Sequence, residues 1–162
     1  DAALGMARAK GVTSILDPGV AQALPDALLR KAAIVSPNET ETQALTGVVV
    51  DSVDTARDAA RALLDRGVGE VVLKLGPLGS YYAGSRGAHY APAFRIAPVD
   101  TTAAGDAFTG ALAVVWGRMD VPDVLRFANA AGALAATVEG AQRSAPTQAA
   151  IEGFIAQNSM QS

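Results

Sequence analysis

Short apolar runs rich in β-branched residues alternate along this chain with helix patterns, and this alternation constrains the fold more than any other feature. The runs are Val12–Leu16, Ala32–Val35 and Glu70–Leu75, and each leads into a turn that contains proline or glycine. Runs of this length and composition are typical of buried strands. Strands that alternate with helices predict an α/β domain with a mostly parallel sheet flanked by helices. In such sheets, ligands bind at the carboxyl ends of the strands.

Start and stop signals delimit the remaining elements. An alternating segment between residues 81 and 99, broken by glycines and Pro92, predicts a small antiparallel meander at the sheet edge. Its three predicted strands are Tyr81–Ala83, Ala88–Ala91 and Phe94–Val99. The predicted helices are residues 2–10, 25–31, 40–45, 52–66 with Ser52 or Asp54 as the cap, 106–117, a long helix that begins at residue 121, and 147–157.

The length of 162 residues predicts a single domain. The net charge of -3 leaves no basic surface for nucleic acid, and no apolar run approaches a membrane span. Without cysteine there is no disulfide framework, and a single histidine excludes a histidine-rich metal site. That histidine, His89, is expected at the surface of an edge strand. The N-terminal segment is typical of a helix rather than a signal peptide, so we expect a soluble, cytoplasmic protein.

The run Asp100-Thr-Thr-Ala-Ala-Gly-Asp-Ala-Phe108 leaves a strand pattern and enters a helix pattern. Small residues at Ala103, Ala104 and Gly105 allow the backbone to approach a ligand, and the free N–H groups of a helix start attract an anion. The carboxylate of Asp106 beside that anion could take a proton from an attacking hydroxyl. The run therefore predicts phosphoryl transfer. The alternative is that Asp106 only caps the helix and the glycine makes a turn.

This run resembles the second signature, DTxxAGDxF, of the phosphofructokinase-B (pfkB) family of sugar kinases. The resemblance implies a Rossmann-like fold of ribokinase type, in which a mostly parallel sheet with a small antiparallel edge forms a three-layer α/β sandwich. It also implies ATP-dependent phosphorylation of a hydroxymethyl group on a sugar or sugar acid. Asp106 would be the catalytic base, and an anion hole would be formed by Ala103, Ala104 and Gly105.

Residues 37–41, Pro-Asn-Glu-Thr-Glu, follow the second predicted strand. A helix cap at Asn38 with an acidic first turn explains this segment without any function. The segment also resembles the NxxE motif of the family, and this implies that Asn38 and Glu41 organise Mg²⁺ and its waters around the ATP phosphates. An ion that keeps several waters and takes few carboxylates is typical of Mg²⁺.

The third predicted strand leads into Gly76-Pro-Leu-Gly79, a turn that could cradle a phosphate or simply reverse the chain. Resemblance to the (T/K)LGxxG motif implies that Lys74, Gly76 and Gly79 approach ATP. Many ribokinases have threonine at the position of Lys74 and asparagine at that of Asp17, so both residues depart from the narrow ribokinase pattern. Asp17 either starts a turn before Pro18 or lies near the nucleotide phosphates or Mg²⁺.

Asn129 lies in an apolar helix pattern, where it either satisfies a backbone group or, as the resemblance implies, lines the adenine pocket. Residues 140–146 resemble the GAxxSxP segment that wraps a monovalent cation in ribokinase-type members. The alternative is an ordinary connection between two helices. The resemblance implies a K⁺ site formed by Asp100, Thr102, Ser144 and the carbonyls of Ala135, Val138 and Gly140.

Members of the family are roughly twice as long, and their first half carries most sugar-binding groups and a β-lid that often forms the dimer. Neither is found in this chain, so we expect residues 1–162 to be the C-terminal, nucleotide-binding part of such a kinase. The expected partners are ATP and a small sugar, with a possible homodimer in a full-length parent. One alternative is a nucleotide-binding or regulatory module without activity. A second, an oxidoreductase, is disfavoured because no GxGxxG follows a strand.

Overall fold

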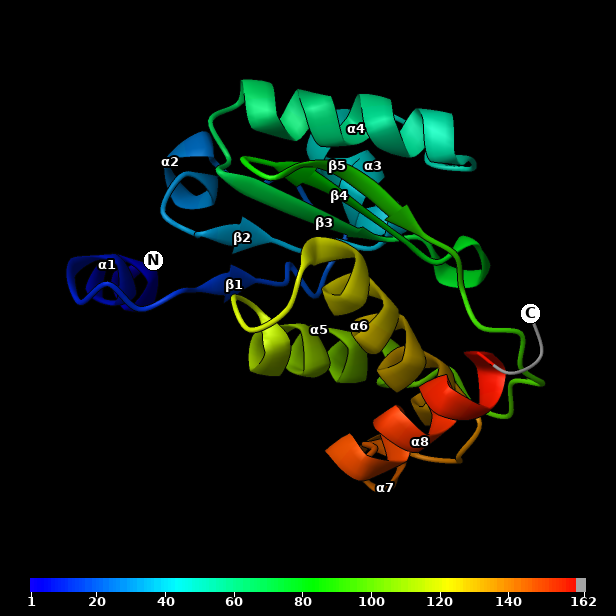
Figure 1. Cartoon of the computed structure of the whole chain (residues 1–162). Coiled ribbons are helices and arrows are strands. Elements are labelled where there is room, and N and C mark those ends of the chain that lie inside the picture. The colour runs from blue at the N-terminus through cyan, green and yellow to red at the C-terminus, as the bar shows by residue number, and fades with distance from the viewer. Residues whose placement is uncertain (160–162) are drawn as a thin grey trace. The chain divides into compact units, whose positions relative to one another are not determined.

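The structure, a computed structural model, describes residues 1–159, which form two compact units that divide between Tyr90 and Ala91 (Figure 1). The first unit contains a five-stranded sheet with the order β1-β2-β3-β4-β5. Strands β1 to β3 are parallel, and β4 pairs antiparallel with β3. The strands are β1 (Ile15–Leu16), β2 (Ile34–Val35), β3 (Glu70–Lys74), β4 (Ser80–Gly84) and β5 (Gly87–Ala91). The predicted mostly parallel sheet with an antiparallel edge is confirmed.

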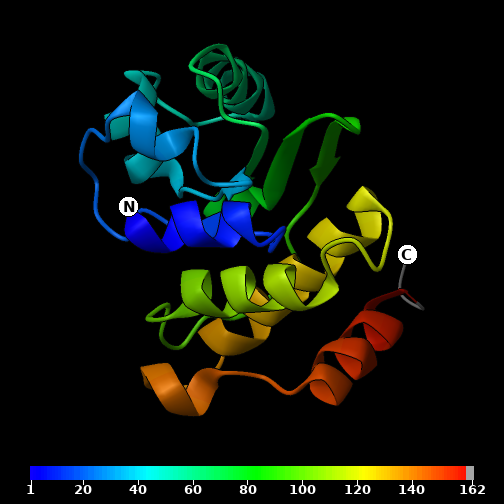
Figure 2. The ribbon, with the colours of Figure 1, turned by 90° about the vertical axis from the view of Figure 1, so that its left-hand side faces the viewer.

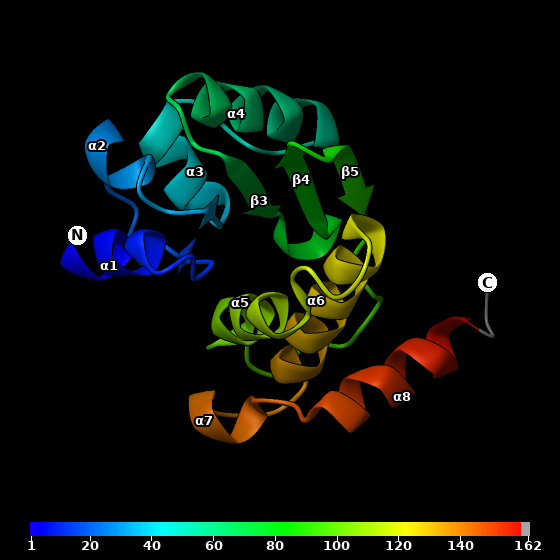
Figure 3. The same cartoon turned by 60° about the vertical axis from the view of Figure 1, so that its left-hand side comes forward.

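Four α-helices accompany the sheet in the first unit. Helices α3 and α4 pack together and cover one face of the sheet (Figures 1 and 3). The helices are α1 (Ala2–Ala9), α2 (Asp26–Leu29), α3 (Glu39–Thr46) and α4 (Val53–Asp65), and a 3₁₀ turn, η1 (Gly76–Leu78), joins β3 to β4. Capping boxes start both α3, at Asn38, and α4, at Ser52. Ser52 rather than Asp54 is therefore the cap of α4, because its hydroxyl accepts the Thr55 N–H.

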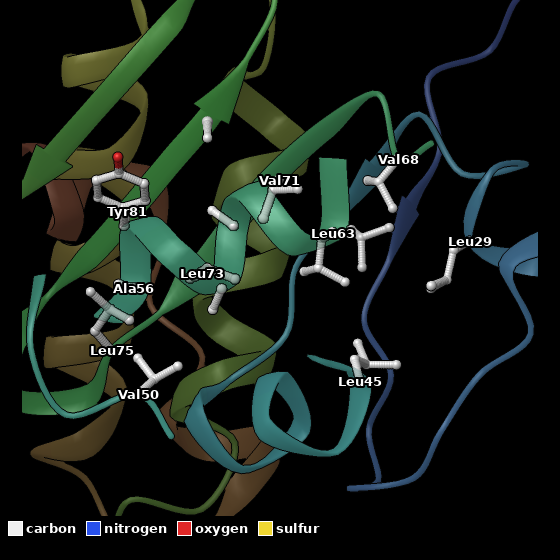
Figure 4. Packing of buried hydrophobic residues seen from close by; sticks show 14 of the residues in the cluster. Leu29, Leu45, Val50, Ala56, Leu63, Val68, Val71, Leu73, Leu75 and Tyr81 are labelled. Atoms are coloured by element: carbon white, nitrogen blue, oxygen red, sulfur yellow. The ribbon is translucent and has the colours of Figure 1, made fainter. Parts of the chain in front are cut away.

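The core of the first unit lies between α4 and the sheet (Figure 4). Alanines and Leu63 occupy one face of α4 at helical spacing, and these side chains are fully buried. They meet Val71 and Leu73, which alternate along β3 and therefore point to the same side of the sheet. Lys74 follows directly and belongs to the opposite face. The packing of one face thus places the last side chain of β3 on the side away from the core.

The second unit is helical and contains α5 (Ala104–Val115), α6 (Val121–Ala136), α7 (Ala141–Ser144) and α8 (Gln148–Ser159). Helix α6 packs against both α5 and α8 (Figure 2). Gly132 of α6 lies against the first turn of α5, because a Cβ there would come within 3.2 Å of the Ala104 carbonyl oxygen. None of the helices between residues 1 and 159 is long and apolar enough to cross a membrane.

The third strand predicted for the edge meander, Phe94–Val99, is wrong: within the described residues this segment forms no strand. Pro98 removes a backbone donor that a strand ladder would use, and Pro92 ends the preceding strand β5. The N–H groups of Val99 and Asp100 instead donate to the Ala136 carbonyl, at 2.8 and 3.2 Å. The segment is therefore tied to the end of α6 and delivers the chain to the loop before α5.

Candidate functional site

The residues predicted to bind nucleotide in the first unit lie where the parallel strands β1, β2 and β3 end. The backbone N–H of Lys74, the last residue of β3, donates to the Pro37 carbonyl at 2.9 Å. Pro37 immediately precedes Asn38, the N-cap of α3. The structure therefore brings Lys74 and Asn38, which are far apart in the sequence, to one edge of the sheet.

Asn38 and Glu41 form a reciprocal pair of hydrogen bonds at the start of α3. The Asn38 Oδ1 accepts the Glu41 N–H at 2.9 Å, and the Glu41 Oε2 accepts the Asn38 N–H at 2.8 Å. Thr40 also donates its hydroxyl to the Asn38 Oδ1. The capping explanation for this segment is thus realised. The cap uses one carboxylate oxygen of Glu41. The other oxygen is outside the cap, and one carboxylate oxygen is enough for an ion that is held mainly by phosphates and water. Among residues 1–159 no three acidic, histidine or cysteine side chains cluster as a metal site.

Two glycines shape the turn after β3. Gly79 has φ 108° and ψ -126°, a conformation that other residues rarely adopt. Gly76 has φ 50°, and a Cβ there would come within 2.7 Å of the Glu39 Oε1. The Gly79 carbonyl accepts the Leu75 N–H at 2.8 Å and closes the turn before β4. The turn is confirmed, whereas its approach to a phosphate stays a prediction.

Lys74 and Asp17, the two residues that depart from the ribokinase pattern, contact each other. The Lys74 Nζ lies 2.5 Å from the Asp17 Oδ2, and the side chains are only 11% and 23% exposed. The pairing was missed at the sequence level because 57 positions separate the two residues. The available signal was that both positions carry charged side chains of opposite sign where the ribokinase pattern has neutral ones.

The loop before α5 contains an unusual backbone conformation. Ala103, the N-cap of α5, has φ 61° and ψ 8°, and among residues 1–159 no other non-glycine residue has a positive φ. A left-handed alanine costs about 1–2 kcal/mol, so the surrounding contacts must hold it. The Ala104 N–H donates to the Thr101 carbonyl at 3.2 Å, and the Ala107 N–H to that of Ala103 at 2.9 Å.

Helix α5 begins at Ala104, two residues earlier than predicted. Asp106 is consequently its third residue, and the explanation of Asp106 as the helix cap is wrong. The N–H groups of Gly105 and Asp106 lie in the first turn, where the helix itself supplies no acceptor. The exposed Asp106 carboxylate therefore stands beside free backbone donors at the positive end of a helix.

A cavity of about 300 Å³ opens beside this first turn, and apolar side chains form most of its wall. The carboxylate-bearing residue Asp106 and the left-handed Ala103 both line this cavity. The lining residues come from α5, α6 and the chain around α7 and α8: Ala103, Asp106, Ala107, Gly110, Ala111, Val114, Phe127, Ala131, Ala141, Ala145, Pro146, Gln148 and Ile151.

The residues predicted to hold a monovalent cation are brought together only in part. The Asp100 Oδ1 accepts the Thr102 N–H and its Oδ2 accepts the Gly140 N–H, both at 2.9 Å. This carboxylate therefore joins the loop before α5 to the loop after α6. Ser144, 4% exposed, donates its hydroxyl to the Ala141 carbonyl at 2.7 Å.

The three remaining predicted ligands are the backbone carbonyls of Ala135, Val138 and Gly140, at the end of α6 and in the loop after it. The carbonyl of Ala135 accepts the Val138 N–H at 3.2 Å in the last turn of α6. The carbonyl of Val138 belongs to the loop that leads to Gly140. A carboxylate, hydroxyls and carbonyls are donors of the kind that suits a hard monovalent ion, and their convergence on one ion stays a prediction.

Hydrogen bonds from the Thr102 hydroxyl, the Gly140 N–H and the Thr102 N–H lower the pKa of the Asp100 carboxyl below its ordinary value of 3.8. A carboxyl whose pKa is lower in the folded chain than in the unfolded chain stabilises the folded chain at pH values above the unfolded-state pKa. That stabilisation is lost as the pH falls through the folded-state pKa.

We therefore expect Asp100→Asn to lower the melting temperature near neutral pH and to differ less from the wild type as the pH drops below about 4. Thermal unfolding of both proteins across this range measures the difference, and a constant gap would contradict the assignment.

Asn129 is buried within α6, at 7% exposure, and its amide contacts the last residue of β5 and the residue after it. The amide nitrogen donates to the Ala91 carbonyl at 3.0 Å and to the Pro92 carbonyl at 3.2 Å. The prediction that Asn129 satisfies backbone groups is confirmed. Its place in an adenine pocket stays a prediction.

Comparison with known proteins gives a consistent result. Residues 1–148 match the model of the pfkB family carbohydrate kinases. Ribokinase of Staphylococcus aureus is 37% identical over 146 residues, which cover 89% of this chain and 48% of that protein. The structure of Arabidopsis thaliana ribokinase complexed with ribose and ATP is similar at a TM-score of 0.87, with 34% identity, over 94% of this chain and 50% of that one.

A structure described as a ribokinase II from E. coli, in complex with ATP and Mg²⁺, is similar at a TM-score of 0.78, with 28% identity. The match covers 96% of this chain and 52% of that one. The chain thus spans about half the length of the curated relatives it matches. These similarities confirm the predicted ribokinase-type fold.

Proposed function

The chain belongs to the pfkB family of carbohydrate kinases, and from this membership we propose that it supplies the nucleotide-binding and catalytic part of a sugar kinase. The reaction transfers the γ-phosphoryl group of ATP to a hydroxymethyl group of a sugar or sugar acid. The observation that carries the proposal is the first turn of α5. There, an exposed carboxylate, free N–H groups and a left-handed alanine lie next to one another.

Asp106 acts as the general base in this proposal. Its carboxylate accepts the proton of the attacking hydroxyl, the oxygen attacks the γ-phosphorus, and ADP leaves with the bond electrons. Backbone N–H groups of residues 103–105 stabilise the charge that develops on the transferring phosphoryl group. Gly105 is better placed than Ala104, because the Ala104 N–H already donates to the Thr101 carbonyl. The left-handed Ala103 turns the chain so that this donor lies at the helix start.

The edge formed by β1, β2 and β3 binds the nucleotide phosphates in this proposal. The glycine turn of Gly76 and Gly79 lets the backbone approach them, and Lys74 contributes positive charge. Asn38 and Glu41 position Mg²⁺ through its waters, and the ion neutralises phosphate charge when bound. The E. coli relative, whose structure holds ATP and Mg²⁺, supports this part. In the second unit, Asn129 is the residue that we assign to adenine, by its match to the family pattern.

A monovalent cation, K⁺, is held by the loops that Asp100 joins. Its ligands are the side chains of Asp100, Thr102 and Ser144, with carbonyls of Ala135, Val138 and Gly140. The hydrogen bonds of Asp100 to Thr102 and Gly140 support this assignment, because they hold its carboxylate between the two loops. A cation here compensates that charge and stiffens the loop that precedes α5.

The acceptor is a small sugar, and a pentose is the first candidate, because the relatives include ribokinases and one structure complexed with ribose. The Asp17–Lys74 pair departs from the ribokinase pattern, so deoxypentoses and hexoses belong in the same screen. A cytoplasmic location and a homodimer in a longer form of the protein are further parts of the proposal.

The deciding experiment is a calorimetric titration of Mg·ATP into the 162-residue chain, first in K⁺ and then in tetramethylammonium. We expect tighter binding in K⁺, and Asp100→Asn should remove the difference between the two salts. Equal affinity in both salts would contradict the cation site, and no binding in either would contradict the nucleotide site.

A second candidate function is a nucleotide-binding module without turnover of its own. ADP release with D-ribose, 2-deoxy-D-ribose and D-fructose separates the two candidates, because the module would bind Mg·ATP without releasing ADP in response to any sugar.

A further inference from the structure

Lys74 is the buried cation of the first unit, at 9% exposure. A buried ammonium is unfavourable unless it is paired, and the Asp17 carboxylate supplies the partner at 2.5 Å. The contact joins the end of β3 to the residue that follows β1. Because a lysine side chain has a long, flexible stem, an ion pair this short restricts where its charge can lie.

Two hydroxyl groups share the face of the sheet on which Lys74 lies. Ser80 pairs with Lys74 in the β3–β4 register, and directly paired residues project to the same face. Leu73 and Tyr81, the adjacent pair, face the α4 core instead. Ser36 follows Val35, which also packs in that core, so alternation places Ser36 on the face of Lys74.

The hydroxyl oxygens of Ser36 and Ser80 are buried, and neither has a hydrogen-bond partner within the described residues. Buried polar atoms are normally hydrogen-bonded, so these two hydroxyls have unused hydrogen-bonding capacity that a water or a ligand oxygen would satisfy. Both belong to the strand ends where the Lys74 N–H meets Pro37, one residue before the cap of α3. The positive end of α3, an ammonium and two hydroxyl donors thus belong to one edge of the sheet. This is a set of groups suited to phosphate oxygens.

We propose that Asp17 and Lys74 act as one unit in binding the nucleotide phosphates: Lys74 contacts phosphate oxygen, and Asp17 is a positioning residue that aims the ammonium. The inference rests on the proposed function and deepens it. A carboxylate near an anion is unfavourable by itself, so its presence requires that it acts through the cation. Loss of Lys74 alone removes the ammonium from this pair and keeps the Asp17 carboxylate.

The test is titration of Mg·ATP into the wild-type chain and into Asp17→Asn, Lys74→Met and the double variant. Lys74→Met should weaken binding by about tenfold, because a charge-assisted contact is lost and a repulsive carboxylate stays. The double variant should bind about threefold more tightly than Lys74→Met, because the repulsion is gone. Asp17→Asn should weaken binding about threefold, because the ammonium loses its anchor.

Lys31→Met is the matched control, because it changes the net charge equally and removes an exposed ion pair with Asp1. It should leave the affinity for Mg·ATP unchanged. Denaturant unfolding of every variant without nucleotide establishes that each one is folded. If the wild type and all Asp17 and Lys74 variants bind Mg·ATP equally well, the inference is overturned while the proposed function stands. Tighter binding by Asp17→Asn would also overturn it, because Asp17 would then only neutralise Lys74. Absence of binding by the wild type would overturn the proposed function, and this inference with it.

Discussion

Asp106→Asn is expected to lower the rate of phosphoryl transfer by roughly 10²–10⁴-fold and to leave the affinity for Mg·ATP nearly unchanged. Asparagine is close to aspartate in size but cannot accept the proton of the attacking hydroxyl. The backbone N–H groups of the first turn of α5 stay in place, because α5 is capped at Ala103 and not at Asp106. The measurement is ADP release from Mg·ATP with a sugar acceptor, on whichever form of the protein turns over.

Asp123→Asn is the matched control for this prediction. Asp123 is an exposed acid at the third position of α6, the same position that Asp106 has in α5. Both substitutions remove a similar favourable interaction with a helix N-terminus, worth about 0.3–1 kcal/mol. If the two variants lose activity equally, Asp106 serves the helix and not the chemistry. A loss confined to Asp106→Asn, with Mg·ATP affinity retained in a titration, supports its assignment as the base.

Leu63→Ala is expected to lower the free energy of unfolding by roughly 2–5 kcal/mol. Leu63 is completely buried between α4 and the sheet, where it packs in the cluster that contains Val71 and Leu73 (Figure 4). Removal of its branched end deletes buried apolar surface and leaves a cavity that rigid strands cannot fill. Denaturant unfolding followed by circular dichroism measures the change.

Leu64→Ala separates this core effect from a change in helix propensity. Leu64 is the next residue of α4 and has the same side chain, but it is only partly buried. Both substitutions introduce alanine into the same helix turn, so helix propensity changes equally. A loss of stability at Leu64 as large as that at Leu63 would indicate that the helix, rather than the core beneath it, sets the effect.

Local patterns predicted those features whose partners are close in the chain. The cap at Asn38 was predicted because an N-cap and the third helical residue are separated by three positions. The buried runs of β2 and β3 and the amphipathic face of α4 were predicted because periodicity reports which face is buried. The turn after β3 was predicted because its glycines and proline are themselves local turn signals.

The errors arose at residues whose conformation depends on contacts with distant parts of the chain, which local sequence patterns do not report. The segment Phe94–Val99 alternates like a strand, yet the N–H groups of Val99 and of the next residue, Asp100, donate to the carbonyl of Ala136 at the end of α6. Ala103 carries no sign of a left-handed conformation, because alanine normally avoids it. The start of α5 was therefore placed two residues too late, and Asp106 was allowed as a cap that it does not form.

The sequence by itself determined the order of the elements, the mostly parallel sheet and the segments that carry the chemistry of the family. Only the tertiary structure decided which distant groups meet: Asp17 with Lys74, Asp100 with Gly140, and the amide of Asn129 with the carbonyl of Ala91. The physical reason is that such contacts depend on strand order and on the close packing of whole elements. A hydrogen bond needs its two heavy atoms within about 3 Å and an ion pair within about 4 Å, and side-chain identity does not specify where the chain brings them.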